Sequence, residues 1–320
     1  MKPLSLLLWL ALVPVAWSQA RTGGEDDTSE EEEDDDDGKD TDGVASIGHL
    51  ASVRMLKMDR VQFGAGHVCA GSLIRDNAVL TAAQCFVDRE IGDGHFLPMS
   101  EFFVVLGTPN RFESSPNTLK FELKHRVLMQ DMFDMKFHEM DVALLILNGS
   151  VPQPHPAVQP IQIADQIFGR KTECQMSGWG RDPTGYSSEA AVSVRVPFIG
   201  PRICLIKQMM QEFFVQPGMI CAKHFGKVKR GYCTGDAGGS LECEGQLAGI
   251  VSWGISCDSP YHPGIYTDVL YYTQWINESL ANPTQLDDYF ASVVQPMISG
   301  AFGRSSLIVY HFIFILYTNQ

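Results

Sequence analysis

Short β-prone runs separated by glycine, proline and asparagine turns fill the chain from Val44 to about Leu280. Closely spaced runs of this kind, with no long segment of helical period between them, are typical of an all-β sandwich or barrel. At the end of the series, Leu270–Leu280 has apolar residues at helical spacing and predicts a helix. The sequence therefore predicts one all-β domain over residues 44–281 that ends in a helix. The clearest predicted strands are Ala78–Ala82, Phe102–Leu106, Val142–Leu147, Gln246–Trp253 and Gly264–Thr267.

Residues 1–20 have the pattern of a secretory signal peptide. Lys2 precedes the apolar run Leu4–Val13, and small residues follow at Ser18 and Ala20. The apolar run is too short to span a membrane. We therefore expect the protein to be secreted and extracellular.

An acidic segment, residues 21–43, follows the predicted signal peptide. Glu25–Asp42 holds thirteen acidic residues and one base, Lys39, so this stretch carries −12 of the chain's formal charge of −14. A run that repels itself and has little to bury is expected to be disordered. It is either a solubilising tail or a site for calcium or a basic partner. The remaining charge of about −2 provides no basic face, which argues against nucleic acid as a partner.

Residues 282–320 are weakly patterned except for the apolar run Leu307–Tyr317. Its eleven residues are too few to cross a bilayer. Small residues upstream, Ser299–Ala301, resemble a lipid-anchor signal, although the spacer between them and the apolar run is short. This tail is therefore either a signal for a lipid anchor at the cell surface or an ordinary chain end. In the second case it packs on the domain or is variable in sequence.

Two further features fit an exported protein. The chain has eight cysteines and no Cys-x-x-Cys pair, which favours disulfides over a metal cluster in an oxidising compartment. We expect neither a metal ion nor another cofactor. Sequons at Asn148 and Asn277 predict glycosylation of these asparagines, which must then be exposed.

Six motifs follow one another in a recognisable order along the domain. They are Cys69–Ile74 with Val79–Cys85, Asp141–Leu145, Ser177–Gly180, Gly235–Ser240, Val251–Gly254 and Pro263–Thr267. In this order they resemble the trypsin-like (chymotrypsin-fold, S1) serine proteases, and the set is far more specific than one short pattern. The resemblance implies two antiparallel six-stranded β-barrels and a C-terminal helix. It also implies four disulfides: Cys69–Cys85, Cys174–Cys243, Cys204–Cys221 and Cys233–Cys257.

The positions that match the family's catalytic triad are Gln84, Asp141 and Ala237. The family has histidine where this chain has Gln84, and serine where it has Ala237. A glutamine amide cannot take up and return a proton near neutral pH, and a methyl group cannot attack a carbonyl. Because loss of triad members costs on the order of 10⁶ in turnover, we expect no enzyme activity. We also expect Gln84 to donate its amide to Asp141, which would satisfy both groups.

Ser240 is the alternative nucleophile, three residues after Ala237 where the family usually has proline. A serine beside glycines is commonly a loop residue, and no sequence motif ties a histidine to this one. An enzyme with a displaced nucleophile is therefore the second interpretation.

Activation in the family depends on a new N-terminus, typically Ile-Val-Gly-Gly, whose ammonium pairs with the aspartate before the nucleophile, here Asp236. No such sequence follows the acidic run, and a cut after Lys39 would expose the charged Asp40. The resemblance instead implies a zymogen-like network in which Asp236 bonds His67, and Ser52 supports His67.

The family's substrate pocket is altered as well. Trypsins carry aspartate where this chain has Gly231, so an uncharged pocket is expected, filled by Tyr232. The matching pocket positions are Gly231, Tyr232, Ser252, Trp253, Gly254 and Gly264.

The resemblance and the altered residues together predict a secreted, non-catalytic homologue of the serine proteases. Its expected work is to bind an extracellular protein as a cofactor or decoy, and that partner would be a protease, a substrate or an inhibitor. Besides the enzyme with a displaced nucleophile, a third interpretation is an acidic scaffold or adhesion protein. Its tail would or would not anchor it at the membrane.

Overall fold

The computed structural model describes residues 47–92, 95–130, 132–180, 188–200, 204, 217–223, 237–254 and 263–284. The predicted signal peptide, acidic segment and C-terminal tail lie outside these ranges, as do Gly231, Tyr232 and Asp236. Among the described residues, no helix is long and apolar enough to cross a membrane.

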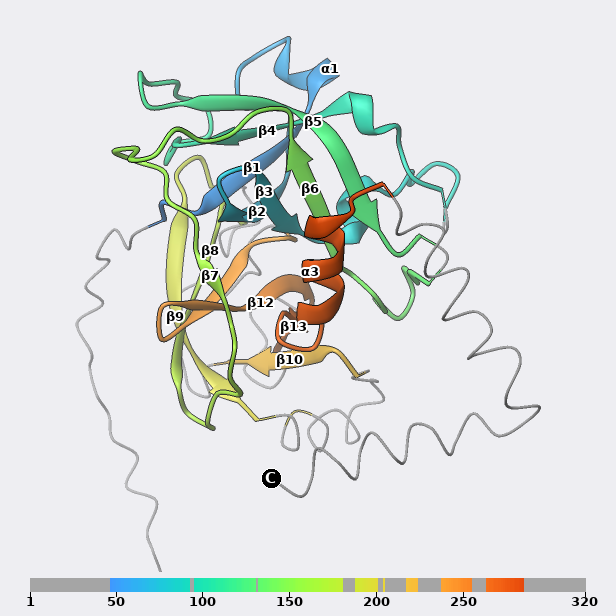
Figure 1. The fold of residues 1–320 in the computed structure, drawn as a ribbon, viewed down its shortest axis with the longest axis vertical. Coiled ribbons are helices and arrows are strands. Elements are labelled where there is room, and N and C mark those ends of the chain that lie inside the picture. Colours follow the sequence, from blue (N-terminus) through green and yellow to red (C-terminus); the bar gives the residue numbers. More distant parts are fainter. Residues whose placement is uncertain are drawn as a thin grey trace, which may run out of the picture. The chain divides into compact units, whose positions relative to one another are not determined.

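Six antiparallel strands close a barrel in the first half of the domain, in the order β1-β2-β3-β6-β5-β4 (Figure 1). Strand β6 is buried along its whole length because its two faces contact different apolar clusters. Leu145 and Leu147 pack inside the barrel, whereas Leu144 and Ile146 pack against the C-terminal helix and its neighbours. The strands are β1 (Leu50–Met55), β2 (His67–Arg75), β3 (Ala78–Thr81), β4 (Phe102–Leu106), β5 (Leu119–Leu128) and β6 (Ala143–Leu147).

A second barrel follows, in which pairing of β11 with β12 closes the ring β11-β8-β9-β10-β13-β12. The short strand β7 (Gln162–Ile163) adds to β12 in parallel. The six strands of the ring are β8 (Glu173–Gly178), β9 (Val192–Ile199), β10 (Met219–Ala222), β11 (Ser240–Cys243), β12 (Gln246–Trp253) and β13 (Gly264–Asp268). With a C-terminal helix after β13, this confirms the predicted all-β fold of two six-stranded barrels.

Short helical elements connect the strands. Helix α1 (Leu56–Asp59) follows β1, and 3-10 turns occur at Ala83–Phe86 and Met99–Glu101. The C-terminal helix is α3 (Thr273–Ala281), which packs Trp275 and Ile276 into the cluster that contains Leu144 of the first barrel.

The predicted helix begins three residues later than expected. Residues before Thr273 form turns rather than helix, because the Asp268 carboxylate accepts the N–H groups of Leu270 and Tyr271. A side chain that bonds nearby backbone in this way competes with helical hydrogen bonds.

Three disulfides are present among the described residues: Cys69–Cys85, Cys174–Cys243 and Cys204–Cys221. Their pairing is the one that the resemblance implies. The predicted pair Cys233–Cys257 lies outside the described residues. Cys69–Cys85 is the bond that matters most for the site, because it fixes the turn Ala83–Phe86 against β2.

Burial shifts the pKa values of two titratable side chains in opposite directions. Burial lowers the pKa of His49, just before β1, to about 4. Burial raises the pKa of Asp268, at the end of β13, to about 6, although the N–H groups of Tyr271 and Leu270 oppose this shift. The folded protein therefore keeps His49 neutral and favours protonation of Asp268 in weakly acidic solution.

We predict that Trp275→Ala lowers the free energy of unfolding by about 3–5 kcal/mol, because it empties a buried indole site between α3 and the first barrel. Urea denaturation with the disulfides intact measures this loss. The neighbouring Gln274→Ala is the matched control: its side chain is exposed and bonds Glu278 on the same helix, so a loss of about 0.5 kcal/mol or less is expected. Equal losses in the two variants would show that α3 does not anchor the barrels.

We also predict opposite pH dependences for variants of His49 and Asp268. Between about pH 4 and pH 6.5 the unfolded chain binds the extra proton at His49, so this residue makes stability fall as the pH falls. Between about pH 4 and pH 6 the folded protein binds the extra proton at Asp268, which makes stability rise as the pH falls. As the pH falls, the free energy of unfolding should therefore decrease more steeply in Asp268→Asn than in the wild type. In His49→Gln it should decrease less steeply than in the wild type. Parallel pH profiles for both variants in urea denaturation would contradict these burial effects.

Candidate functional site

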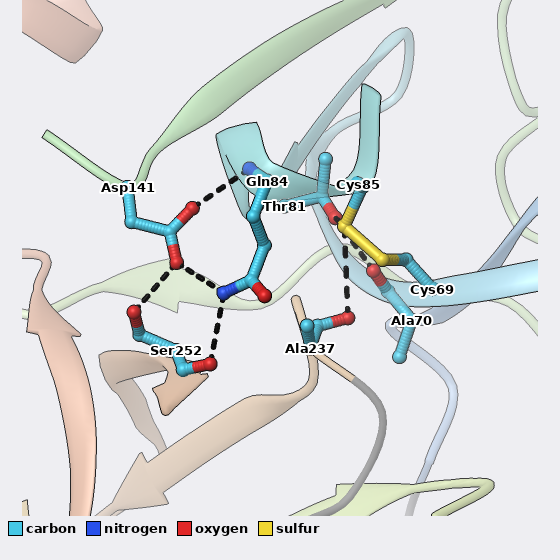
Figure 2. The surroundings of a disulfide bond; sticks show 8 residues. All are labelled: Cys69, Ala70, Thr81, Gln84, Cys85, Asp141, Ala237 and Ser252. Carbon is cyan, nitrogen blue, oxygen red and sulfur yellow. Dashed lines mark hydrogen bonds between the residues drawn. A yellow bond between two sulfur atoms is a disulfide. The ribbon is translucent and has the colours of Figure 1, made fainter. Parts of the chain in front are cut away.

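Asp141 lies two residues before β6, and its side chain is buried between segments of both barrels (Figure 2). Its Oδ1 accepts the backbone N–H of Gln84 at 2.9 Å, and its Oδ2 accepts the Ser252 hydroxyl at 2.5 Å. Its backbone carbonyl accepts the hydroxyl of Thr267 at 2.7 Å. Three different segments therefore hold this one residue in place.

Gln84, the position that the resemblance matches with the family's catalytic histidine, lies next to Asp141. Its Nε2 donates one hydrogen to Asp141 Oδ2 at 2.6 Å and the other to the Ser252 carbonyl at 2.9 Å. The expected hydrogen bond between Gln84 and Asp141 is thus present. Both amide hydrogens are used, and the group has no proton that it could exchange with a substrate near neutral pH.

Burial raises the pKa of Asp141, whereas the hydrogen bonds from Ser252 and Gln84 oppose that rise. A buried carboxylate without such donors would be costly. Gln84 therefore stabilises the Asp141 carboxylate as a hydrogen-bond donor without supplying a base.

Ala237 lies between the two barrels, with its methyl group packed against the apolar clusters of both. Its carbonyl accepts the N–H of Ala70 on β2 at 3.0 Å. The next residue, Gly238, has φ of +87°, and a Cβ there would lie 2.2 Å from both the Ala70 carbonyl oxygen and the Thr81 hydroxyl. The backbone at Ala237 and Gly238 is thus closely packed, and the Ala237 side chain is a methyl group, which is not a nucleophile.

Ser240 is not a loop residue, contrary to the expectation from its glycine neighbours: it begins β11. Its hydroxyl lies 3.0 Å from Nε2 of His49, a contact that the sequence did not indicate. Both side chains are buried, and Ser240 has no exposed surface. In this conformation a substrate carbonyl cannot reach the hydroxyl.

Ser52 and His67 are in contact, as the hypothesis of a zymogen-like network requires of these two members. Ser52 Oγ lies 2.7 Å from Nδ1 of His67, and the His67 ring meets the Trp179 indole edge-on, with the ring centroids 5.2 Å apart. Arg54, which sequence reasoning missed, donates from Nε to Ser52 Oγ at 2.8 Å. Because Asp236 lies outside the described residues, its bond to His67 stays a prediction.

The pocket positions are described only in part. Ser252 and Trp253 end β12, Gly254 follows it and Gly264 begins β13. Gly231 and Tyr232 lie outside the described residues. The His138 ring stacks on the Trp253 indole, with centroids 5.8 Å apart and planes 14° from parallel. Burial lowers the pKa of His138, although Asp141 and Asp134 oppose this shift. An imidazole that the sequence did not single out therefore covers one face of Trp253.

Asn148 and Asn277 are exposed, as glycosylation requires, and the modification itself stays a prediction. Among the described residues, no group of three histidine, cysteine, aspartate or glutamate side chains is arranged to hold a metal ion.

Comparison with known proteins finds a match to the family model described as Trypsin over residues 52–276. Trypsin zeta of Drosophila melanogaster is 30% identical over 221 residues, which cover 67% of this chain and 75% of that protein. Coagulation factor XII of Bos taurus is 34% identical over 68% of this chain, and the match spans only 36% of that longer protein. Among solved structures, neuropsin, a serine protease expressed in the limbic system of mouse brain, matches with a TM-score of 0.58 and 25% identity. That match covers 73% of this chain and 95% of neuropsin. The chain belongs to the trypsin family of serine proteases.

Proposed function

We propose that this member of the family is a secreted, non-catalytic homologue that works by binding. Its partner would be a protease, a protease substrate or a protease inhibitor, towards which the chain acts as a cofactor or decoy. The barrel loops provide the recognition surface, since a rigid scaffold with variable loops is a common basis for binding.

The observation that carries this proposal is the hydrogen bonding of Gln84. Its amide donates to Asp141 and to the Ser252 carbonyl at the place where a protease needs a base. Proton transfer by a positioned base is what makes a serine hydroxyl nucleophilic. Here the neighbouring alanine, Ala237, has no hydroxyl to activate, so two members of the triad are lost together.

Three disulfides support the proposed extracellular location, because such bonds persist in oxidising compartments.

The alternative, an enzyme with a displaced nucleophile, rests on the contact between Ser240 and His49. A pKa of about 4 keeps the His49 imidazole neutral near neutral pH, as a general base must be. The burial of Ser240 argues against this alternative, because a nucleophile must touch the substrate carbonyl and Ser240 has no exposed surface.

We predict that the purified protein does not hydrolyse peptide esters above the buffer rate. The panel should include arginine, phenylalanine and alanine esters, since no charge in the pocket is predicted. Ser240→Ala is the matched control and should give the same rate. Hydrolysis by the wild type that disappears in Ser240→Ala would replace this proposal with the displaced nucleophile.

We further predict that Gln84→His and Ala237→Ser together restore little ester hydrolysis. Both triad side chains would then be present, but the chain has no activating N-terminus of the family's type to pair with Asp236. The double variant should stay on the order of 10³-fold or more below an activated trypsin assayed beside it, because an unformed site loses most of the triad's contribution. Activity close to that of trypsin would show that no N-terminal switch is needed.

A further inference from the structure

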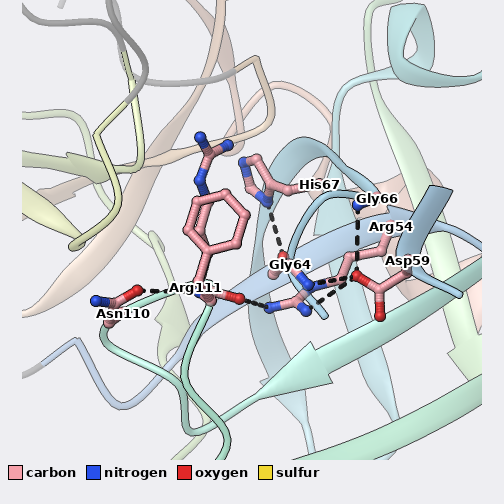
Figure 3. A network of polar contacts seen from close by, with 9 residues as sticks. Arg54, Asp59, Gly64, Gly66, His67, Asn110 and Arg111 are labelled. Carbon is pink, nitrogen blue, oxygen red and sulfur yellow. Dashed lines mark hydrogen bonds and ion pairs between the residues drawn. The ribbon is translucent and has the colours of Figure 1, made fainter. Parts of the chain in front are cut away.

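A buried ion pair holds residues 56–66, the segment between β1 and β2, in place. Arg54 has no exposed surface, and its Nη1 lies 3.2 Å from Oδ1 of Asp59, the last residue of α1 (Figure 3). The same carboxylate oxygen accepts the N–H of Gly64 at 2.7 Å and of Gly66 at 3.4 Å. Asp59 thereby joins the start of the segment to its end.

Other groups fix the segment against the barrel. The guanidinium of Arg54 donates from Nη2 to the Arg111 carbonyl at 2.9 Å, and its central carbon lies 4.4 Å from the centroid of the Phe63 ring. The ammonium of Lys120, on β5, lies 4.5 Å from the same centroid. Gly64 has φ of +92°, and a Cβ there would lie 2.3 Å from the Arg111 carbonyl oxygen. The segment is thus pre-organised, which reduces the entropy lost when a partner binds.

The outer face of this segment combines two cations with two exposed apolar side chains. Val61 is 87% exposed and Met58 is 51% exposed. Lys57 and Arg60 are also exposed, and neither forms an ion pair with another residue in the described ranges. Because the charge of Asp59 faces the buried Arg54, it does not neutralise these two cations at the surface. A small, positively charged face with apolar groups remains on a chain whose charge outside the acidic segment is about −2.

We propose that Lys57, Met58, Arg60 and Val61 form a docking surface for a peptide segment of a partner protein that carries carboxylates beside an aliphatic or aromatic side chain. The inference rests on the proposed binding function and names the surface that performs it. Charge complementarity selects an acidic partner, and the two apolar groups favour a protein over a sulfated polysaccharide, whose binding depends on charge alone. Arg54 connects the segment that carries this surface to the predicted zymogen-like network, because it bonds both Asp59 and the Ser52 hydroxyl.

The test uses a random dodecapeptide library displayed on phage and selected on the purified full-length protein. We expect the enriched peptides to contain two or more acidic residues close to an aliphatic or aromatic one. Fluorescence anisotropy with synthetic copies of these peptides then measures the dissociation constants. Lys57→Glu with Arg60→Glu should weaken binding by about tenfold or more, and Val61→Ser by about threefold or more. Circular dichroism checks that these surface variants remain folded.

A second pair of exposed cations supplies the matched control. Arg75→Glu with Lys171→Glu makes the same change in net charge, at the far end of β2 and in the turn before β8, and should leave binding unchanged. Equal weakening in the control pair, or enriched peptides without acidic residues, would overturn the proposal. A third result would also overturn the proposal: a heparin hexasaccharide binds in a way that depends on Lys57 and Arg60, while Val61→Ser has no effect on peptide binding. None of these three outcomes changes the result expected in the ester assays, whereas ester hydrolysis by the wild type would refute the proposed function and not this surface.

Discussion

The site between the two barrels depends on a buried carboxylate that has to be hydrogen-bonded. Asp141 is enclosed, and its oxygens accept bonds from Gln84 and Ser252, which come from different barrels. In a catalytic member of the family a histidine would serve both as donor to this carboxylate and as base. Gln84 donates to the Asp141 carboxylate but is not a base near neutral pH, so the contacts of this carboxylate do not require a base at position 84.

Packing also determines the backbone at Ala237, the position that the resemblance matches with the nucleophile, and at Gly238. Gly238 is needed because β2 lies too close for any side chain, and the Ala237 carbonyl pairs with the N–H of Ala70. Neither constraint involves the side chain at position 237. Packing alone is therefore enough to explain the backbone at Ala237 and Gly238, and this shape by itself does not indicate activity.

Much of the fold was predictable because its determinants are local. The strands Phe102–Leu106 and Gln246–Trp253 have the bounds that their apolar runs indicate, and the disulfides described follow the family pairing. The helix was placed too early because the side-chain bonds of Asp268 to the following backbone override the apolar period.

The site was predictable only where motifs mark it. Gln84 and Asp141 lie in recognisable strings, and their contact follows from them. His49 and Ser240 are 191 residues apart, and the stacking of His138 on Trp253 and the burial of Arg54 are likewise products of tertiary packing. No local sequence pattern predicts such contacts, because a lone histidine or arginine in a strand-rich sequence is usually exposed.

The most direct measurement of whether this site is catalytic is covalent labelling of the folded protein with a serine-reactive phosphonate, followed by peptide mass spectrometry. A site with Gln84 at the base position, Ala237 at the nucleophile position and Ser240 enclosed predicts no phosphonylated serine, even with the reagent in large excess. A phosphonate adduct on Ser240, abolished by denaturing the protein before the reagent is added, would contradict the non-catalytic assignment.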